Sequence, residues 1–166
     1  MYTYTHIGGE NPKTLHEVKA SPDWPKWEKA VKAELEVLDH MGTWKLVERP
    51  PDVKPVACRW VFIKKYNKEG ELLKYKARLV AKGFTQRPGF EYNDTFTPVV
   101  RLETICALLA IVPNKNLKLQ QMDVKGAYLH GILQENIYMV QPEGFDDGTS
   151  KVCHLVKSLY GLKQSG

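Results

Sequence analysis

The feature that most constrains this chain is two strand-like segments separated by a short turn. Val56–Tyr66 and Leu72–Phe84 are rich in β-branched, aromatic and alternating apolar residues, which is the composition of β-strands. Between them, Asn67–Gly70 (NKEG) has the residue types that reverse a chain sharply. The sequence therefore predicts a long antiparallel hairpin. Helices and strands are both predicted elsewhere, so the expected fold class is α+β.

Positive charge is concentrated on this hairpin. From Arg59 to Arg87 there are nine lysines and arginines and two acidic residues, so the segment carries +7, whereas the rest of the chain carries −2. On the second strand the basic residues occupy even positions and so share one face: Lys74, Lys76, Arg78 and Lys82. A row of cations suits a row of phosphates, which predicts a nucleic-acid partner. A solvated, charged hairpin without a partner is the alternative.

Predicted helices and strands surround the hairpin. A helix begins after Asp23, has Pro25 in its first turn and ends before Gly42. Residues 1–22 are predicted to be a loose lead-in, and Thr104–Val112 to be a buried apolar helix. The other predicted elements are strands over Thr43–Val47, Leu117–Val124, Ile137–Val140 and Val152–Val156, a turn or short helix over Gly126–Leu133, and a helix that opens at Ser158.

Composition points to a reducing compartment inside the cell. The three cysteines, Cys58, Cys106 and Cys153, are odd in number and widely spaced, which favours free thiols over a disulfide framework. No run approaches the ~20 apolar residues of a membrane span, and the N-terminus lacks the features of a secretory signal. We therefore expect no membrane partner. The five histidines do not have metal-ligand spacing.

One carboxylate has a sequence setting that suits a metal ion. Asp123 comes at the end of the predicted strand Leu117–Val124, where a sheet can hold a carboxylate rigidly. The backbone carbonyl of Val124 could add a second oxygen ligand, and the following turn could return Tyr128 to the same place. A role as a turn residue or helix cap is the alternative for a lone aspartate.

Seven sequence motifs occur in order between Trp27 and Ser165. They are Met41–Val47 (MGTWKLV), Trp60–Lys65 (WVFIKK), Tyr75–Phe84 (YKARLVAKGF), Thr95–Val99 (TFTPV), Gln121–Gly131 (QMDVKGAYLHG), Tyr138–Phe145 (YMVQPEGF) and Lys157–Gln164 (KSLYGLKQ). With these motifs, the chain resembles the N-terminal part of a copia-type LTR-retrotransposon reverse transcriptase.

The resemblance implies a fold and a set of site residues. Residues 23–166 would be a partial reverse transcriptase domain, with fingers over roughly 23–100, including the hairpin, and the first half of a palm sheet over roughly 101–166. Asp123 would be the first palm carboxylate, which binds Mg²⁺ or Mn²⁺ together with the Val124 carbonyl. The nucleotide-binding residues would be Lys65 and Arg78, with Lys76 as a rival, at the triphosphate, Tyr128 beneath the sugar, where it rejects a 2′-hydroxyl, and Gln164. The nucleic-acid contacts would be Lys64, Lys74 and Lys82.

The resemblance also implies a reaction and its partners. In RNA-directed DNA synthesis a primer 3′-hydroxyl attacks the α-phosphate of a dNTP between two metal ions. The partners would be an RNA template, an RNA–DNA duplex, a dNTP and the remaining C-terminal part of the polyprotein. The family's place of action would be the cytoplasm, in a virus-like particle, or the nucleus.

One expected motif is not found in the sequence. The family's second acidic motif, aromatic-x-Asp-Asp, lies downstream of the segments matched here, and Asp94, Asp146 and Asp147 lack the flanking residues that would replace it. We therefore expect a truncated domain of marginal stability that does not synthesise DNA alone. A non-enzymatic nucleic-acid-binding remnant of a transposon is an alternative, as is a relic without a stable fold.

Overall fold

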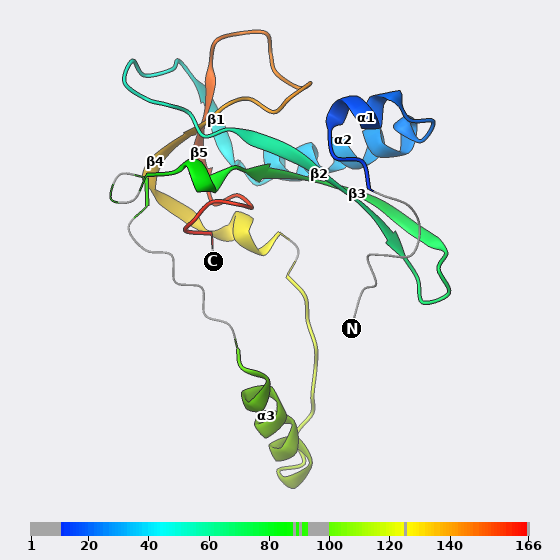
Figure 1. The fold of residues 1–166 in the computed structure, drawn as a ribbon. Coiled ribbons are helices and arrows are strands. Elements are labelled where there is room, and N and C mark those ends of the chain that lie inside the picture. The colour runs from blue at the N-terminus through cyan, green and yellow to red at the C-terminus, as the bar shows by residue number, and fades with distance from the viewer. Residues whose placement is uncertain (1–10, 88, 90, 93–99, 125, 166) are drawn as a thin grey trace.

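The fold combines helices with two antiparallel sheets (Figure 1). A computed structural model of the chain describes residues 11–87, 89, 91–92, 100–124 and 126–165. Its elements, in chain order, are α1 (Leu15–Ala20), α2 (Trp24–His40), β1 (Trp44–Val47), β2 (Cys58–Tyr66), β3 (Leu72–Ala81), the 3₁₀ turn η1 (Gly83–Thr85), α3 (Leu102–Asn114), the 3₁₀ turn η2 (Ala127–His130), β4 (Ile132–Met139) and β5 (Val152–Lys157).

The predicted hairpin is confirmed. β2 and β3 pair antiparallel from Cys58↔Ala81 outward, with one irregularity at Lys65/Tyr66. Gly70 closes the turn at a φ of +84°, a conformation that glycine adopts without strain. One face of the hairpin is buried near its base, where its side chains belong to the core: Trp60, Phe62, Ala77 and Leu79.

Helix α2 covers this buried face, and α1 lies beside it (Figure 1). The ring of Trp27 meets Phe62 and Tyr75 edge-on, with centroid distances of 5.3 and 4.7 Å. Such pairs add to the gain from burying the rings. Trp27 is buried together with Val31 and Leu38, as the helical spacing predicts. The helix ends where predicted, with Gly42 at a φ of +61°.

The second sheet has the strand order β1-β5-β4. It is joined to the base of the hairpin through Val56, whose N–H donates to the Tyr138 carbonyl and whose carbonyl accepts from the Val140 N–H. The indole of Trp60 donates to the Glu143 carbonyl at 3.2 Å. Side chains of both sheets therefore share one core, which holds the hairpin base in place.

Two predictions for the chain ends are wrong. The lead-in contains the helix α1, whose Leu15 and Val18 are buried and whose Thr14 hydroxyl accepts from the Glu17 N–H. Although the helix is short, docking of these two apolar side chains stabilises it. The helix predicted from Ser158 is instead a series of turns, held by hydrogen bonds from Ser158 to Ser165 and from Ser165 to the Leu159 carbonyl.

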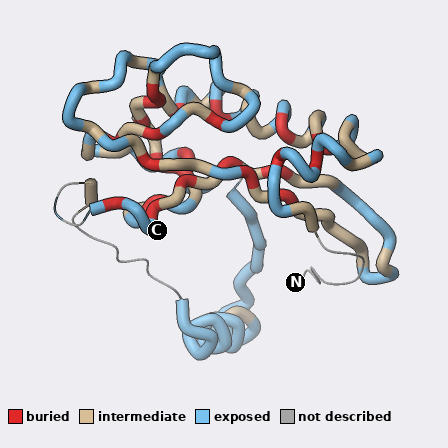
Figure 2. The backbone as a smooth tube through the Cα atoms, turned by 45° about the horizontal axis from the view of Figure 1, so that its top comes forward, coloured by how far each residue is buried: buried red, intermediate tan, exposed pale blue. Residues whose placement is uncertain are grey.

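The middle of the chain also departs from the predictions. Helix α3 forms, but it stands apart from both sheets and has no buried residue (Figure 2). The predicted strand Leu117–Val124 is irregular and exposed, because no described segment supplies the hydrogen-bonding partner that a strand requires. Among the described helices, none has the length and apolar character to cross a bilayer. The motif Thr95–Val99 lies outside the described residues.

Candidate nucleic-acid and nucleotide interface

Four cations lie on the face of the hairpin opposite the core. Lys65 pairs directly with Lys74 across the two strands, and Lys76 and Arg78 follow along β3 opposite the apolar Ile63 and Val61. We call Lys65, Lys74, Lys76 and Arg78 the basic row. Partial burial lowers the pKa of Lys76, and the nearby charges of Arg78 and Lys65 lower it further. Cations that crowd each other in this way favour an anion beside them.

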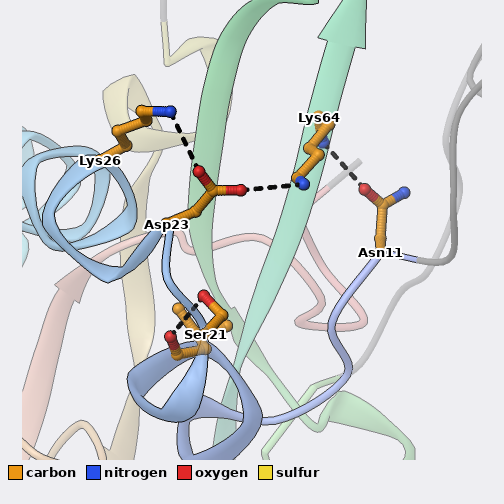
Figure 3. Close-up of polar contacts among 6 residues, drawn as sticks. Asn11, Ser21, Asp23, Lys26 and Lys64 are labelled. Carbon is orange, nitrogen blue, oxygen red and sulfur yellow. Dashed lines mark hydrogen bonds and ion pairs between the residues drawn. The ribbon is translucent and has the colours of Figure 1, made fainter.

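Lys64 lies on the other face of the same strand (Figure 3). Its ammonium is 3.2 Å from the Asp23 carboxylate and 5.5 Å from the centre of the Tyr75 ring. Asp23 also accepts from Lys26 at 3.0 Å, and the Asn11 side-chain oxygen accepts from the Lys64 backbone N–H. Lys64 therefore ties the hairpin to the start of α2, and its charge is already paired.

Lys82 follows the last residue of β3. Its backbone N–H donates to the Ala57 carbonyl at 2.7 Å, and its side chain is half-buried. It shares the alternation of the basic row but comes after the β3 ladder has ended.

The basic row continues into an aromatic cluster. The Arg78 guanidinium lies over the ring of Tyr160, 4.6 Å from its centre. The Tyr160 ring also meets the Tyr128 ring edge-on, with a centroid distance of 5.0 Å. A cation over an aromatic face is held there by the ring's quadrupole. Arg78 and Tyr128, which are 50 positions apart in the chain, thus belong to one continuous surface.

Tyr128 borders a cleft of about 400 Å³. Tyr128 is 38% exposed, so a ligand can reach it. Besides Tyr128, the polar side chains in the lining are Gln134, Glu135, Ser158, Gln164 and Ser165. Three of the seven residues that the resemblance predicts to bind nucleotide or metal are therefore close to one another around Tyr160 and the cleft: Arg78, Tyr128 and Gln164.

Glu34 of α2 is the acidic neighbour of the basic row. Burial raises its pKa, against a hydrogen bond from the Leu79 backbone and the charges of Arg78 and Lys76, which lower it. Glu34 therefore offsets part of the positive charge at the hairpin base, and the excess is greatest toward Lys65 and Lys74.

The metal site predicted at Asp123 is not assembled by the described residues. Asp123 and Val124 are both exposed and lie in irregular chain rather than at the end of a strand, and neither lines the cleft beside Tyr128. No group of three or more acidic, histidine or cysteine side chains comes together in the described part of the chain. Because magnesium is held by several oxygen ligands in a fixed arrangement, these residues do not fit it.

Two residues in this region escaped the sequence reasoning. Tyr160 links Arg78 to Tyr128, and Gln86, only 5% exposed, donates to the Gln164 side chain at 3.2 Å. Tyr160 lies within the motif Lys157–Gln164, so the motif already contained it. Gln86 has no comparable signal, because a glutamine after a strand is usually exposed.

Comparisons with known proteins match this chain to a reverse transcriptase family model and to Pol polyproteins from transposons. The family model described as reverse transcriptase (RNA-dependent DNA polymerase) matches residues 41–166. The retrovirus-related Pol polyprotein from transposon TNT 1-94 of Nicotiana tabacum is 46% identical over 156 residues, which are 93% of this chain and 12% of that protein. The corresponding polyproteins from transposons RE2 and RE1 of Arabidopsis thaliana are 41% and 46% identical, over 99% and 84% of this chain and 11% and 10% of their own lengths.

The chain thus spans about a tenth of the length of these curated relatives. No solved structure gives a significant match.

Proposed function

This chain belongs to the reverse transcriptase (RNA-dependent DNA polymerase) family of copia-type retrotransposons, and we propose that it binds nucleic acid and nucleotide for RNA-directed DNA synthesis. In this proposal residues 23–100 act as fingers and residues 101–166 as part of a palm. The basic row holds phosphates, and the cleft beside Tyr128 and Gln164 receives the sugar of a dNTP.

The observation that carries the proposal is the contact of Arg78 with Tyr160 and of Tyr160 with Tyr128. It joins a row of cations to a cleft that has an aromatic wall. In a nucleotide the phosphates are attached to the sugar, so the phosphates would lie on the cations while the sugar lies in the cleft. Lys65 and Arg78 would contact the triphosphate, with Lys76 as the rival for this role. Lys74 and Lys82 would follow the backbone of an RNA template or RNA–DNA duplex.

The roles in the cleft depend on shape. The Tyr128 ring would exclude a 2′-hydroxyl, and Gln164 would offer its amide to the nucleotide. The remaining part of a Pol polyprotein is the proposed protein partner. Since the described residues do not fit magnesium, the proposal stops at binding and includes no step at a metal ion.

Salt dependence of binding tests the proposal. We expect a fluorescent RNA–DNA duplex to bind with little sequence preference and, for about four phosphate contacts, with a slope of log K against log salt of roughly −3 to −4. Replacing Lys74, Lys76 and Arg78 together by Glu should abolish this binding in an anisotropy titration.

A second triple variant controls for net charge. Glu at Lys29, Lys45 and Lys54, which are exposed and lie outside the hairpin, changes the charge equally but should leave most of the affinity. Equal losses in the two triple variants would contradict a specific binding face. So would an affinity that stays constant between low and moderate salt.

A nucleic-acid-binding protein without enzymatic activity is the second candidate. Asp123 is exposed, and among the described residues it joins no group of three or more acidic, histidine or cysteine side chains, which favours this candidate. Primer extension on an RNA template with Mg²⁺ or Mn²⁺ separates the two: synthesis that is lost in Asp123→Asn would identify an enzyme, and duplex binding without synthesis is the result expected for the chain alone.

A further inference from the structure

Gln86 is a buried polar side chain with both ends of its amide in use. It follows the turn η1 and is 5% exposed. Its oxygen accepts from the Lys163 backbone N–H at 2.9 Å, and its nitrogen donates to the Gln164 side-chain oxygen at 3.2 Å. A buried amide is costly unless it is hydrogen-bonded in this way.

The Gln164 amide is consequently held from two directions. Its oxygen faces the Gln86 donor, and its nitrogen donates to the Glu91 carbonyl at 2.9 Å. Turned by 180°, the same amide would place oxygen against oxygen at Glu91 and nitrogen against nitrogen at Gln86. Only one orientation satisfies both neighbours.

The backbone around these amides leaves little room for rearrangement. The Ala81 N–H donates to the Tyr160 carbonyl at 2.8 Å, and the Gly83 N–H donates to the Gly161 carbonyl. A Cβ on Gly83 would overlap that carbonyl, and one on Gly161 would overlap the Ala81 carbonyl. The segment that carries Gln86 is therefore fixed against the segment that carries Gln164.

We propose that Gln86 is a positioning residue, which fixes the direction in which Gln164 presents its amide to the cleft. Gln164 lines the cleft, and an amide nitrogen that donates one hydrogen to Glu91 keeps a second hydrogen for a ligand. That hydrogen suits an acceptor oxygen of a nucleotide. The inference rests on the proposed function, since it assigns the ligand of the same cleft.

The variant Gln86→Glu tests the role directly. A carboxylate still accepts from the Lys163 N–H but can no longer donate to Gln164, so the Gln164 amide loses its preferred orientation. With dGTP as the probe, we expect Gln86→Glu to weaken dGTP binding about fivefold, which corresponds to the loss of one hydrogen bond between Gln164 and the ligand. Gln164→Ala should weaken it at least as much, and the double variant should be no weaker than Gln164→Ala.

The side-chain amide resonances of Gln164 give a readout that needs no ligand. In a ¹⁵N-labelled chain they should shift in Gln86→Glu, and also in Gln86→Met, which keeps the volume without burying a charge. The exposed Gln120 provides the matched control Gln120→Glu, which should change neither these resonances nor dGTP affinity.

The outcomes separate the two proposals. If Gln164→Ala weakens dGTP binding and Gln86→Glu does not, the positioning role is wrong and the proposed function stands. Losses that multiply in the double variant, or unchanged Gln164 resonances, also overturn the positioning role. If Gln164→Ala leaves dGTP affinity unchanged, the nucleotide role of Gln164 is wrong, and the inference is overturned with it.

Discussion

Asp23 shows how one carboxylate can serve a different purpose from the one its position suggests. It precedes α2 as a cap residue should, but it makes no side-chain hydrogen bond to the helix backbone. Hydrogen bonds from Lys26, Tyr75 and Lys64 instead lower its pKa to about 2. The sequence located the start of the helix correctly, but local pattern cannot reveal a partner such as Lys64, which is 41 positions away.

Acid should therefore weaken the fold through Asp23. Its folded pKa lies below the unfolded value near 4, so its contribution to stability is present above about pH 4 and is lost as the pH falls toward 2. We expect Asp23→Asn to lower the melting temperature at pH 7 and to lose less of it between pH 4 and pH 2. Thermal melts at each pH measure both effects.

Asp147 is a second aspartate that should make the fold sensitive to acid. Hydrogen bonds from Thr149 and Gln141 lower its pKa to about 2 as well, so some acid sensitivity should remain in Asp23→Asn and become smaller when Asp147→Asn is added. An Asp23→Asn protein with the same pH profile as the parent chain would refute the role given to this carboxylate.

Within β2, neighbouring lysines have opposite roles because a strand turns successive side chains to opposite faces. Lys65→Gln should weaken duplex binding and reduce the salt slope by about 1. Lys64→Gln should leave duplex affinity within about twofold but lower the melting temperature, since Asp23 loses a partner. Anisotropy titrations and thermal melts on the two variants test this, and similar effects of both would contradict the assignment of faces.

The elements that the sequence predicted well are those whose signals are local. The turn at Asn67–Gly70, the alternation of β3 and the helical spacing of α2 all act over a few residues. The sequence could not predict the state of Leu117–Val124, because its apolar pattern becomes a strand only beside a partner. The same dependence explains Asp123: its expected site required a strand end, which in turn required a neighbouring strand.

The site was predictable in part for the same reason. The motifs contained Arg78, Tyr128 and Gln164, and the structure brings them close together. The contacts that connect them run through Tyr160 and Gln86, and they arise only when segments about 80 positions apart meet.

Of the α-helices in the described part of the chain, α3 alone has no buried residue. All but one of its residues are exposed, including Leu102, Leu108 and Leu109, and a helix of 13 residues without tertiary packing is marginal in water. We expect its backbone amides to exchange with solvent far faster than those of β2 and β3. Hydrogen-exchange mass spectrometry measures this, and equal protection of α3 and the hairpin would mean that α3 is packed in solution.

The bond from Trp60 to the Glu143 carbonyl joins residues 83 positions apart, and this has a consequence during synthesis. A ribosome adds about 5–20 residues per second, so the indole waits about 4–17 seconds before its acceptor has been made. Throughout that interval the apolar side of the hairpin base lacks part of its cover while the nascent chain grows. A chaperone that binds β2 during translation would therefore act within a window set by the length of chain between Trp60 and Glu143.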